Sequence, residues 1–193
     1  MTQPQNATDA ERRRFVLEMF SASSVGAEIG VHQGDFSRVI LDVVSPSILH
    51  LIDPWKHEPS PEYERAWYGG QAEKGQAEMD ERYANVLGRF EDEIRAGQVI
   101  VHRSQSADAL GSLPDESLDW VYIDGNHLYE FVAEDLRLSL AKTKRGGLIT
   151  GDDYAEGGWW QGGVKRAVDE LASSGVARLV LVRNGQYVFE KAS

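Results

Sequence analysis

The segment Val-Gly-Ala-Glu-Ile-Gly-Val-His-Gln-Gly, from Val25 to Gly34, is a short apolar run that passes into a loop. One acid, Glu28, interrupts the apolar run, and the loop contains Gly30 and Gly34. Asp35 comes next and suits the start of a helix, because a carboxylate there meets the positive end of the helix dipole. A buried strand that ends in glycines and leads into a helix is the usual first unit of a nucleotide-binding α/β sheet. The glycines would let the backbone approach a ligand closely, because they carry no Cβ.

Apolar periodicity on both sides of this segment predicts alternating helices and strands. We expect helices over residues 11–22, 35–44, 79–96, 106–110, 128–141 and 162–173, with residues 1–10 disordered. We expect strands over residues 25–31, 48–53, 99–102, 118–124, 148–151, 177–182 and 186–190. Asn184-Gly185 lies between the last two strands and is typical of a β-hairpin, so the final strand should be antiparallel to its neighbour. The predicted fold is therefore an α/β, Rossmann-like three-layer sandwich with a mostly parallel, seven-stranded sheet and an antiparallel C-terminal hairpin strand.

The composition is that of one domain spanning residues 1–193. Hydrophobic residues make up 41% of the chain, and no apolar run approaches the roughly 20 residues that a membrane helix needs. Met1 to Arg14 is polar and lacks the apolar core of a signal peptide, so we expect a cytoplasmic protein without a membrane partner. The absence of cysteine excludes disulfides and thiolate metal sites. The formal net charge of −11 would repel a phosphate backbone, which argues against a nucleic-acid partner.

Residues 54–76 form a long connection without a clear period, directly after the second predicted strand. Long connections in compact domains are usually functional, and this one follows the ligand-binding end of the strand. The segment contains Trp55, Tyr63, Trp67 and Tyr68 amid proline, glycine and charged residues. It could serve as a lid or substrate wall, or it could be an insertion whose aromatic side chains pack only on one another. Exposed aromatic residues on such a lid could also provide a contact between subunits of a homo-oligomer.

Three further segments, together with Glu28 to Gly34, resemble motifs of the class I S-adenosylmethionine-dependent methyltransferases. The segments are Leu51-Ile52-Asp53-Pro54-Trp55, Leu118-Asp119-Trp120-Val121-Tyr122-Ile123-Asp124-Gly125-Asn126-His127-Leu128-Tyr129-Glu130 and Arg145-Gly146-Gly147-Leu148-Ile149-Thr150-Gly151-Asp152-Asp153-Tyr154. Within that class the chain looks like the small metal-dependent O-methyltransferases typified by macrocin and novobiocin tailoring enzymes. The resemblance covers about residues 20–190. It departs from the family pattern at His32, which replaces a frequent glycine, and at Asn126, which replaces a frequent second acid.

This resemblance implies S-adenosylmethionine as the cofactor. The residues that it assigns to cofactor binding are Glu28, Gly30, Gly34, Asp53, Ser106 and Asp124. Asp53, at the end of the second strand, would accept hydrogen bonds from the ribose hydroxyls, and Ser106 would lie near the adenine. Glu28 would act through the glycine loop on the cationic methionine end. The alternative for Asp53 is a carboxylate that only caps a turn.

Asp124, Asp152 and Asp153 follow the fourth and fifth predicted strands, which we expect to be parallel neighbours. Their carboxylates should therefore converge at one edge of the sheet. Three carboxylates without a nearby lysine or arginine repel one another, and a hard divalent cation would relieve that repulsion. Oxygen ligands favour Mg²⁺, with Mn²⁺ and Ca²⁺ as alternatives. It also remains open that one of the two adjacent aspartates caps the following helix and binds no cation.

Methyl transfer from a sulfonium needs an oxygen nucleophile close to the methyl group, and aliphatic hydroxyls are weakly acidic. A cation can lower the pKa of a bound oxygen, and a nearby base can accept the proton. His127 is the leading candidate for that base and Asp124 is the second, although His127 could instead orient a carboxylate. We therefore expect metal-assisted O-methylation of a hydroxyl on a small sugar-like or natural-product metabolite.

Two other classes of function remain open from the sequence. A catalytically idle module would bind S-adenosylmethionine without metal dependence, and a metal-dependent hydrolase would act without binding the cofactor. The aspartates argue against the first alternative, and the segment from Glu28 to Gly34 argues against the second. A nicotinamide dehydrogenase is disfavoured because the segment has no Gly-x-Gly-x-x-Gly.

Overall fold

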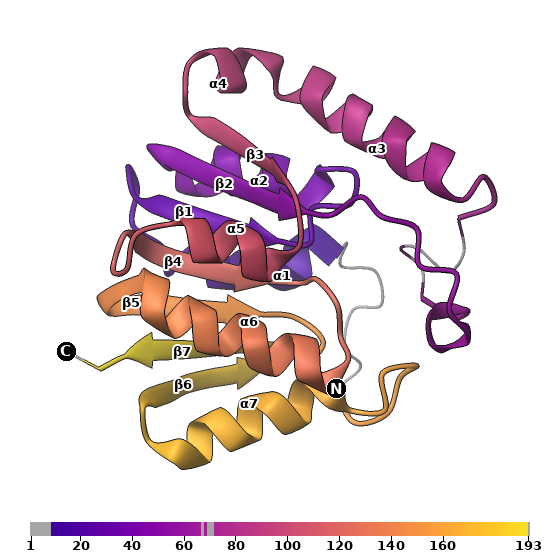
Figure 1. Ribbon diagram of the computed structural model, residues 1–193. Helices are drawn as coiled ribbons and strands as arrows, with labels where there is room; N and C mark the ends of the chain where they lie inside the picture. The colour runs from indigo at the N-terminus through magenta and orange to yellow at the C-terminus, as the bar shows by residue number, and fades with distance from the viewer. Residues whose placement is uncertain (1–8, 67, 69–71, 193) are drawn as a thin grey trace, which may run out of the picture.

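The computed structural model describes residues 9–66, 68 and 72–192, and it is built around a seven-stranded sheet (Figure 1). Across the sheet the strands are β3 (Val99–Arg103), β2 (Ile48–Asp53), β1 (Val25–Ile29), β4 (Leu118–Ile123), β5 (Thr143–Gly151), β7 (Gln186–Lys191) and β6 (Ala177–Arg183). The strands β1 to β5 are parallel, whereas β7 is antiparallel to both β5 and β6. Asn184 and Gly185 both have positive φ, at 53° and 80°, as a tight hairpin turn requires. The predicted fold class is confirmed.

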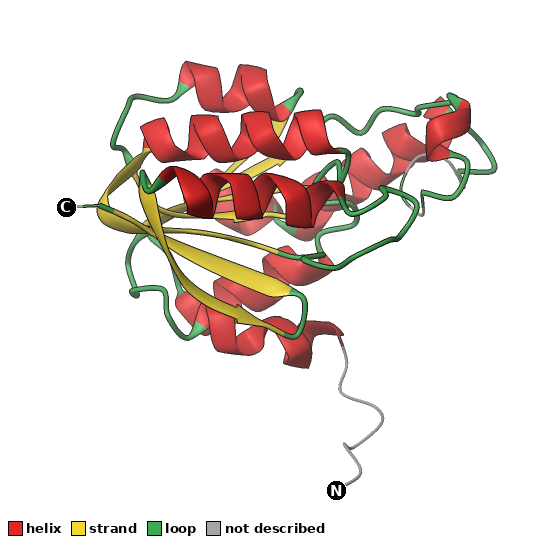
Figure 2. Cartoon of the chain, turned by 90° about the horizontal axis from the view of Figure 1, so that it is seen from below, coloured by secondary structure: helices red, strands yellow, loops and turns green. Residues whose placement is uncertain are grey.

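Helices cover both faces of the sheet (Figures 1 and 2). One face carries α1 (Asp9–Leu17), α2 (Asp35–Val44), α3 (Gln76–Arg89) and the short α4 (Glu91–Arg95). The other face carries α5 (Ser106–Ser112), α6 (Tyr129–Lys142) and α7 (Gly163–Ser174). A single turn of 3₁₀ helix, η1 (Pro61–Tyr63), lies in the long connection after β2. None of the helices described is long and apolar enough to cross a membrane.

The central strand β4 shows how the sheet divides the core into two layers. Trp120 and Tyr122 pack with α1, α2 and α3, whereas Val121 and Ile123 pack with α5, α6 and α7. The ring of Phe20 stacks on Trp120 with centroids 4.3 Å apart. These four side chains are almost fully buried, because β4 lies between two helical layers, and this explains why its sequence is mostly apolar.

The structure differs from the sequence prediction at several element boundaries. The first helix is Asp9–Leu17 instead of 11–22, so residues 9 and 10, predicted to be disordered, are helical, while 1–8 lie outside the described residues. The helix predicted over 79–96 is divided into α3 and α4, because Phe90 leaves helical geometry at φ −113° and its side chain is fully buried. The fifth strand, predicted over 148–151, begins earlier, so that residues 144–147 also belong to β5, where Nζ of Lys144 contacts Asp119 at 2.7 Å.

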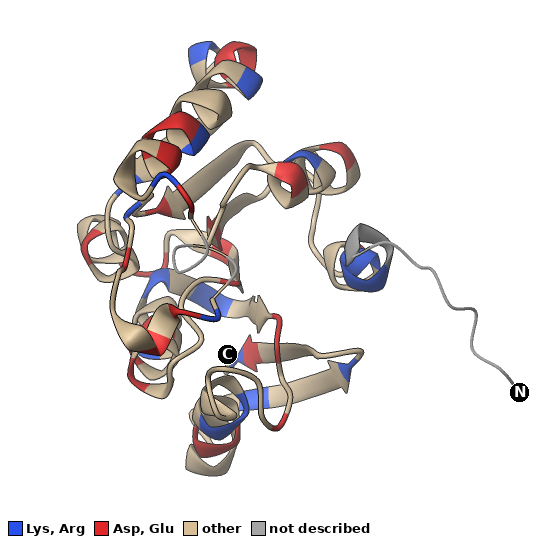
Figure 3. Ribbon diagram, turned by 90° about the vertical axis from the view of Figure 1, so that its right-hand side faces the viewer, with Lys and Arg blue, Asp and Glu red and all other residues tan. Residues whose placement is uncertain are grey.

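The carboxyl ends of β1, β2, β4 and β5 meet at one edge of the sheet because these strands are parallel. Figure 3 faces this side of the molecule and shows acidic residues in red at the strand ends, with α1 beside them. Ligands bind at this edge in open α/β sheets, where the strand order changes direction. Here the change lies between β1 and β4, next to the loop that contains Gly30.

Candidate active site

The acids predicted to bind a cation lie at the ends of β4 and β5, which are paired strands. Nε2 of His127 faces two of them, at 3.1 Å from Oδ2 of Asp153 and 3.5 Å from Oδ1 of Asp124. One ligand atom from each of these three residues lies within 4.8 Å of the others. The structure therefore brings Asp124, Asp153 and His127 together as a possible cation-binding group.

Asp152, the third predicted metal ligand, has other partners. Its Oδ2 lies 2.6 Å from Nη2 of Arg13, and its Oδ1 accepts hydrogen bonds from the Asp153 amide at 2.8 Å and from Gln186. The same guanidinium contacts Oδ2 of Asp124 through Nη1 at 2.5 Å. The expectation that no lysine or arginine compensates these acids is wrong, because Arg13 reaches them from α1.

The pKa values in this cluster reflect burial and mutual charge. Desolvation, with the neighbouring charge of Asp124, raises the pKa of Asp152 to about 6, although Arg13 opposes the increase. Burial alone would lower the pKa of His127, but the carboxylates around it, Asp124 first, raise its pKa above the ordinary value. His127 therefore holds a proton more readily than a free imidazole does.

The donor set of this cluster fits a divalent cation. Nε2 of His127 is buried and faces two carboxylate oxygens without a well-formed hydrogen bond to either, and Nδ1 also lacks a partner among the described residues. Buried polar atoms usually have partners, so a group that this chain does not itself supply would complete the geometry. Two carboxylates and an imidazole suit Mn²⁺ and similar ions, whereas an all-oxygen set would favour Mg²⁺.

The glycine loop packs directly on the end of β4. Gly30 has φ +90°, and a Cβ built on it would lie only 2.0 Å from the carbonyl oxygen of Asp124. His32 also has a positive φ, 56°, a conformation that glycine adopts more readily than a residue with a Cβ. Its ring nitrogen Nε2 lies 2.8 Å from Nη1 of Arg82, and burial together with Arg82 lowers the pKa of His32 to about 4. His32 thus has a structural partner on α3.

Asp53 is fully buried and holds the loop in place. Its Oδ2 accepts hydrogen bonds from the amides of Val31 and His32, at 3.0 and 2.9 Å. Its Oδ1 accepts from the Trp55 amide at 2.7 Å and from the hydroxyl of Tyr68. Both oxygens therefore have protein donors, as in the turn-capping alternative, and ribose binding by Asp53 stays a prediction.

Three cofactor candidates remain, Glu28, Ser106 and Gly34, and the first two contact buried polar groups. Oε2 of Glu28 accepts a 2.5 Å hydrogen bond from Ser37, and burial raises the pKa of Glu28 to about 8. Ser106, at the start of α5, hydrogen-bonds Asp135, whose pKa burial raises to about 7. Gly34 precedes α2 in a left-handed conformation and packs on Phe90. Contacts with adenine or with the methionine end stay predictions for these residues.

Aromatic side chains gather beside His127. Its ring centroid lies 5.8 Å from that of Trp159 and 5.0 Å from that of Trp160, and Tyr63 meets Trp159 at 5.6 Å. The Tyr63 hydroxyl also accepts a 2.8 Å hydrogen bond from Asn126, in the loop after β4. The connection after β2 therefore reaches the loops around the acid cluster, as a substrate wall would.

The other aromatic residues of residues 54–76 have different surroundings. Trp55 belongs to the main core and contacts Tyr83 with ring centroids 5.0 Å apart, while Tyr68 contacts Asp53. Trp67 lies outside the described residues. The segment is thus partly anchored in the core and partly placed at the candidate site.

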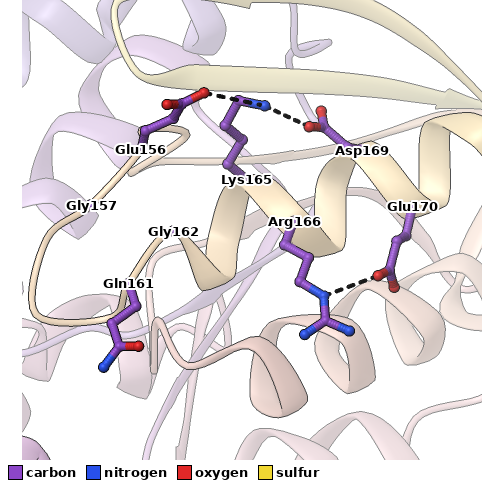
Figure 4. Close-up of a pocket in the computed structure, with 8 residues that line it drawn as sticks. All are labelled: Glu156, Gly157, Gln161, Gly162, Lys165, Arg166, Asp169 and Glu170. Carbon is purple, nitrogen blue, oxygen red and sulfur yellow. Dashed lines mark hydrogen bonds and ion pairs between the residues drawn. The ribbon is translucent and has the colours of Figure 1, made fainter.

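A cavity of about 650 Å³ opens next to this aromatic group. It is lined by Pro61, Glu62, Glu64, Arg65, Leu128, Tyr129, Glu130, Gly158, Trp159, Trp160, Gln161, Gly163 and Arg166. A second hollow, about 450 Å³, runs along α7 (Figure 4). Its charged residues pair with one another, Lys165 with Asp169 at 2.7 Å and Arg166 with Glu170 at 3.1 Å. The cavity of about 650 Å³ is the better substrate candidate, because Trp159 and Trp160 line it and also lie beside His127.

The antiparallel pair β6 and β7 distinguishes this sheet from an ordinary dinucleotide-binding fold. Together with the acids around a glycine loop, it defines the class I S-adenosylmethionine-dependent methyltransferases. Sequence comparison agrees: residues 27–154 match the family described as "Methyltransferase domain". This match spans more than half of the chain, and the chain belongs to that methyltransferase family. A search among curated proteins gave no match.

Solved structures share the fold at low sequence identity. The O-methyltransferase NovP is 19% identical, with a TM-score of 0.64 over 95% of this chain and 81% of its own. An O-methyltransferase from Bacillus cereus in complex with SAH is 13% identical, with a TM-score of 0.62 over 99% and 84% of the two chains. A putative rRNA-methylase from Clostridium thermocellum is 12% identical, with a TM-score of 0.66 over 98% of each chain. These likenesses establish the fold and leave the methylated atom to be proposed.

Sequence reasoning missed Arg13 and Gln186 at this site. Both lie outside the motifs, and both contact Asp152 across long stretches of chain. The polar ends of β2, β4 and β5 were visible in the sequence, but nothing in α1 indicates that Arg13 points to them while its neighbour Arg14 is exposed.

Proposed function

We propose that the protein transfers a methyl group from S-adenosylmethionine to a hydroxyl oxygen of a small sugar-like or natural-product metabolite, assisted by a divalent cation such as Mg²⁺. The observation that supports this most is the position of Nε2 of His127 between carboxylate oxygens of Asp124 and Asp153. The aromatic rings of Trp159 and Trp160 lie next to it. A hydroxyl bound there would meet acids and a possible base on one side and flat apolar surfaces on the other.

The residues have separate tasks in this proposal. Asp124 and Asp153, with Asp152 or His127, would hold the cation. S-adenosylmethionine supplies an electrophilic methyl group, and a bound cation makes a nearby hydroxyl more acidic. His127 would accept the hydroxyl proton, and Asp124 is the second candidate for that task. The carboxylates raise the pKa of His127 in the metal-free protein, and a cation bound to them would oppose this shift and favour the neutral imidazole that accepts a proton.

The aromatic wall would select and shield the substrate. Tyr63, Trp159 and Trp160 present ring faces suited to stacking on a sugar or an aglycone. Asn126 fixes the Tyr63 hydroxyl and so ties the wall to the loop that carries His127. The net charge of −11 supports a small-molecule substrate over a nucleic acid. A cytoplasmic location and assembly into a homo-oligomer stay predictions.

Calorimetry with S-adenosylhomocysteine tests the cofactor part of this proposal. Binding to the folded protein is expected, and its absence would refute the proposal. Methyl transfer to a panel of hydroxylated sugars and aglycones, with and without EDTA, tests the chemistry. EDTA should abolish turnover, and activity that EDTA leaves unchanged would remove the cation from the mechanism.

Asp153→Asn separates the cation from the cofactor. We expect the variant to lose cation-dependent turnover while its affinity for S-adenosylhomocysteine stays within about twofold of the wild type, because Asp153 follows β5, whereas the glycine loop follows β1, two strands away in the sheet. Glu156→Gln, a change of the same charge at an exposed neighbouring position, is the control and should retain turnover. Cofactor binding without turnover on any substrate of the panel would favour the idle-module alternative.

A further inference from the structure

Arg13 lies where a cation would be expected between two of the acids. Its guanidinium contacts Oδ2 of Asp124 at 2.5 Å and Oδ2 of Asp152 at 2.6 Å, and it lies over the ring of Phe36, 5.2 Å from the centroid. All three charged side chains are largely buried, with exposed fractions of 16% for Arg13, 18% for Asp124 and 6% for Asp152. A guanidinium bridging two buried carboxylates provides the positive charge that these acids need.

Because Arg13 occupies oxygens of Asp124 and Asp152, the ligand atoms left for a metal ion are not those of the three aspartates. Asp152 has no oxygen free, because its second oxygen accepts from the Asp153 amide and from Gln186. Asp124 retains only Oδ1, on the side of His127. The atoms that remain are Oδ1 of Asp124, Nε2 of His127 and Oδ2 of Asp153.

We propose that Arg13 is a built-in cation that competes with the divalent metal ion for Asp124 and Asp152, and so selects which ligand set the metal meets. With Arg13 in place, the set is Asp124, His127 and Asp153, whose imidazole nitrogen favours Mn²⁺ and Co²⁺ over Mg²⁺. With Arg13 displaced, three carboxylates form an all-oxygen set that suits Mg²⁺. This inference rests on the metal assistance put forward under the proposed function.

The same competition decides what His127 can do. One nitrogen cannot coordinate a metal ion and accept a proton at the same time. The ligand set that includes His127 is therefore a resting arrangement, and the three-aspartate set frees Nε2 to act as a base. Exchange between them needs only a change of the Arg13 side chain, because Val16 and Leu17 keep the last turn of α1 buried in the core.

Metal titration without cofactor or substrate tests the inference. Calorimetry with Mg²⁺ and Mn²⁺, and Co²⁺ absorption spectra, would be measured for the wild type, Arg13→Gln and Arg14→Gln. Arg14 is the matched control, since Arg14→Gln removes the same charge one residue away, from an exposed side chain that pairs with Glu18 in the described part of the chain. Arg13→Gln should bind Mg²⁺ about tenfold more tightly or better, because the site gains net negative charge and a third carboxylate. Arg14→Gln should bind Mg²⁺ as the wild type does.

Two further variants show which ligands are used. Asp152→Asn should weaken Mg²⁺ binding in the Arg13→Gln background far more than in the wild type, whereas His127→Asn should abolish the wild-type Co²⁺ spectrum. Circular dichroism verifies folding. Arg13→Lys keeps the charge but cannot bridge both carboxylates, so we expect it to raise Mg²⁺ affinity by a smaller factor than Arg13→Gln. If Arg13→Gln does not fold, the comparison of Arg13→Lys with the wild type replaces it.

Two results would overturn the inference and are distinguishable from each other. Equal Mg²⁺ affinity in wild type, Arg13→Lys and Arg13→Gln overturns the role of Arg13 while leaving the metal site in place. Absence of metal binding in every folded variant overturns both this inference and the proposed metal assistance, without bearing on the binding of S-adenosylhomocysteine.

Discussion

The backbone amide of His32 donates a 2.9 Å hydrogen bond to the carboxylate of Asp53, which joins the loop after β1 to the end of β2. The same oxygen accepts from the Val31 amide, and the other accepts from Trp55 and Tyr68. Because the carboxylate is buried, no water could accept hydrogen bonds from these four donors in its place. Asp53 thus fixes the shape of the loop that would receive a cofactor.

Asp53→Asn should lower the free energy of unfolding by about 2–4 kcal/mol, because the amide NH₂ would face buried donors and leave them unsatisfied. Urea unfolding measures this change. Asp35→Asn is the control, since the Asp35 side chain is 79% exposed and its loss should alter stability by less than about 0.5 kcal/mol. Equal stability of Asp53→Asn and wild type would contradict the loop-fixing role. Weaker binding of S-adenosylhomocysteine is expected alongside the lost stability.

Gly30→Ala should destabilise the protein by about 2–5 kcal/mol, because the residue has φ +90° and the added methyl would collide with the Asp124 backbone. Gly88→Ala is the matched control. Gly88 lies inside α3 with nothing within 4 Å of an added Cβ, so alanine should stabilise the helix by up to about 1 kcal/mol. The Tm should fall for Gly30→Ala and rise for Gly88→Ala. An unchanged Tm for Gly30→Ala would show that the backbone at the end of β4 moves to accommodate the methyl group.

Glu28 should make stability depend on pH. The buried carboxyl has its pKa raised from an ordinary 4.5 to about 8, so the folded state holds a proton that the unfolded state releases. Its favourable effect is complete below pH 4.5 and is lost as the pH rises through 8. Glu28→Gln, which mimics the protonated form, should match the wild type near pH 4.5 and exceed it by several kcal/mol, on the order of 4, at about pH 9.

Denaturant unfolding of Glu28→Gln and wild type at the two pH values measures this linkage. Glu91→Gln, at an exposed position on α4, should show no such pH-dependent gain. If the difference between Glu28→Gln and wild type is the same at both values, Glu28 is ionised in the folded protein and its burial is compensated by Arg13.

The buried pair His50 and His102 should make the stability of the protein fall at acidic pH, whereas Glu28 should make it fall at alkaline pH. Nδ1 of His50 lies 2.9 Å from Nε2 of His102, and burial together with His102 lowers the pKa of His50 from 6.5 to about 4. Burial also lowers the pKa of His102. The unfolded state therefore takes up protons first on acidification, and stability should fall as the pH drops from 6.5 toward 4.

His50→Leu should flatten that acid-induced loss of Tm, because the variant has no buried imidazole to protonate at this position. His57→Gln changes a histidine outside the pair and should keep the wild-type slope. NMR titration of the imidazole signals gives an independent measurement. A His50 signal that titrates near 6.5 would refute the expectation.

The order and direction of the strands could be predicted because each depended on local signals. Asn184-Gly185 marks the hairpin, and runs such as Ile48 to Asp53 are apolar until a terminal acid. The boundaries that were missed depend on distant packing. Phe90 ends α3 because its ring is buried against other elements, and the start of β5 depends on pairing with Leu118.

The candidate site was predictable only as far as its acids lie at strand ends. Asp124, Asp152 and Asp153 do meet at one edge, as parallel strands require. Arg13 binds Asp124 and Asp152, whereas His127 faces Asp124 and Asp153. The contacts of Arg13 join residues more than a hundred positions apart, which no local pattern encodes. Asp53 shows the same limit, since its four donors come from three separate segments.

The residues that set the charge of this edge lie partly beyond the segment shared with the methyltransferase family. The matched span runs from residue 27 to 154, whereas Arg13 precedes it and Gln186 follows it, and both hold Asp152. Two proteins identical throughout that span can therefore differ by a full positive charge at the same pair of aspartates. Sorting related enzymes by metal requirement would need the flanking helix and hairpin to be aligned as well.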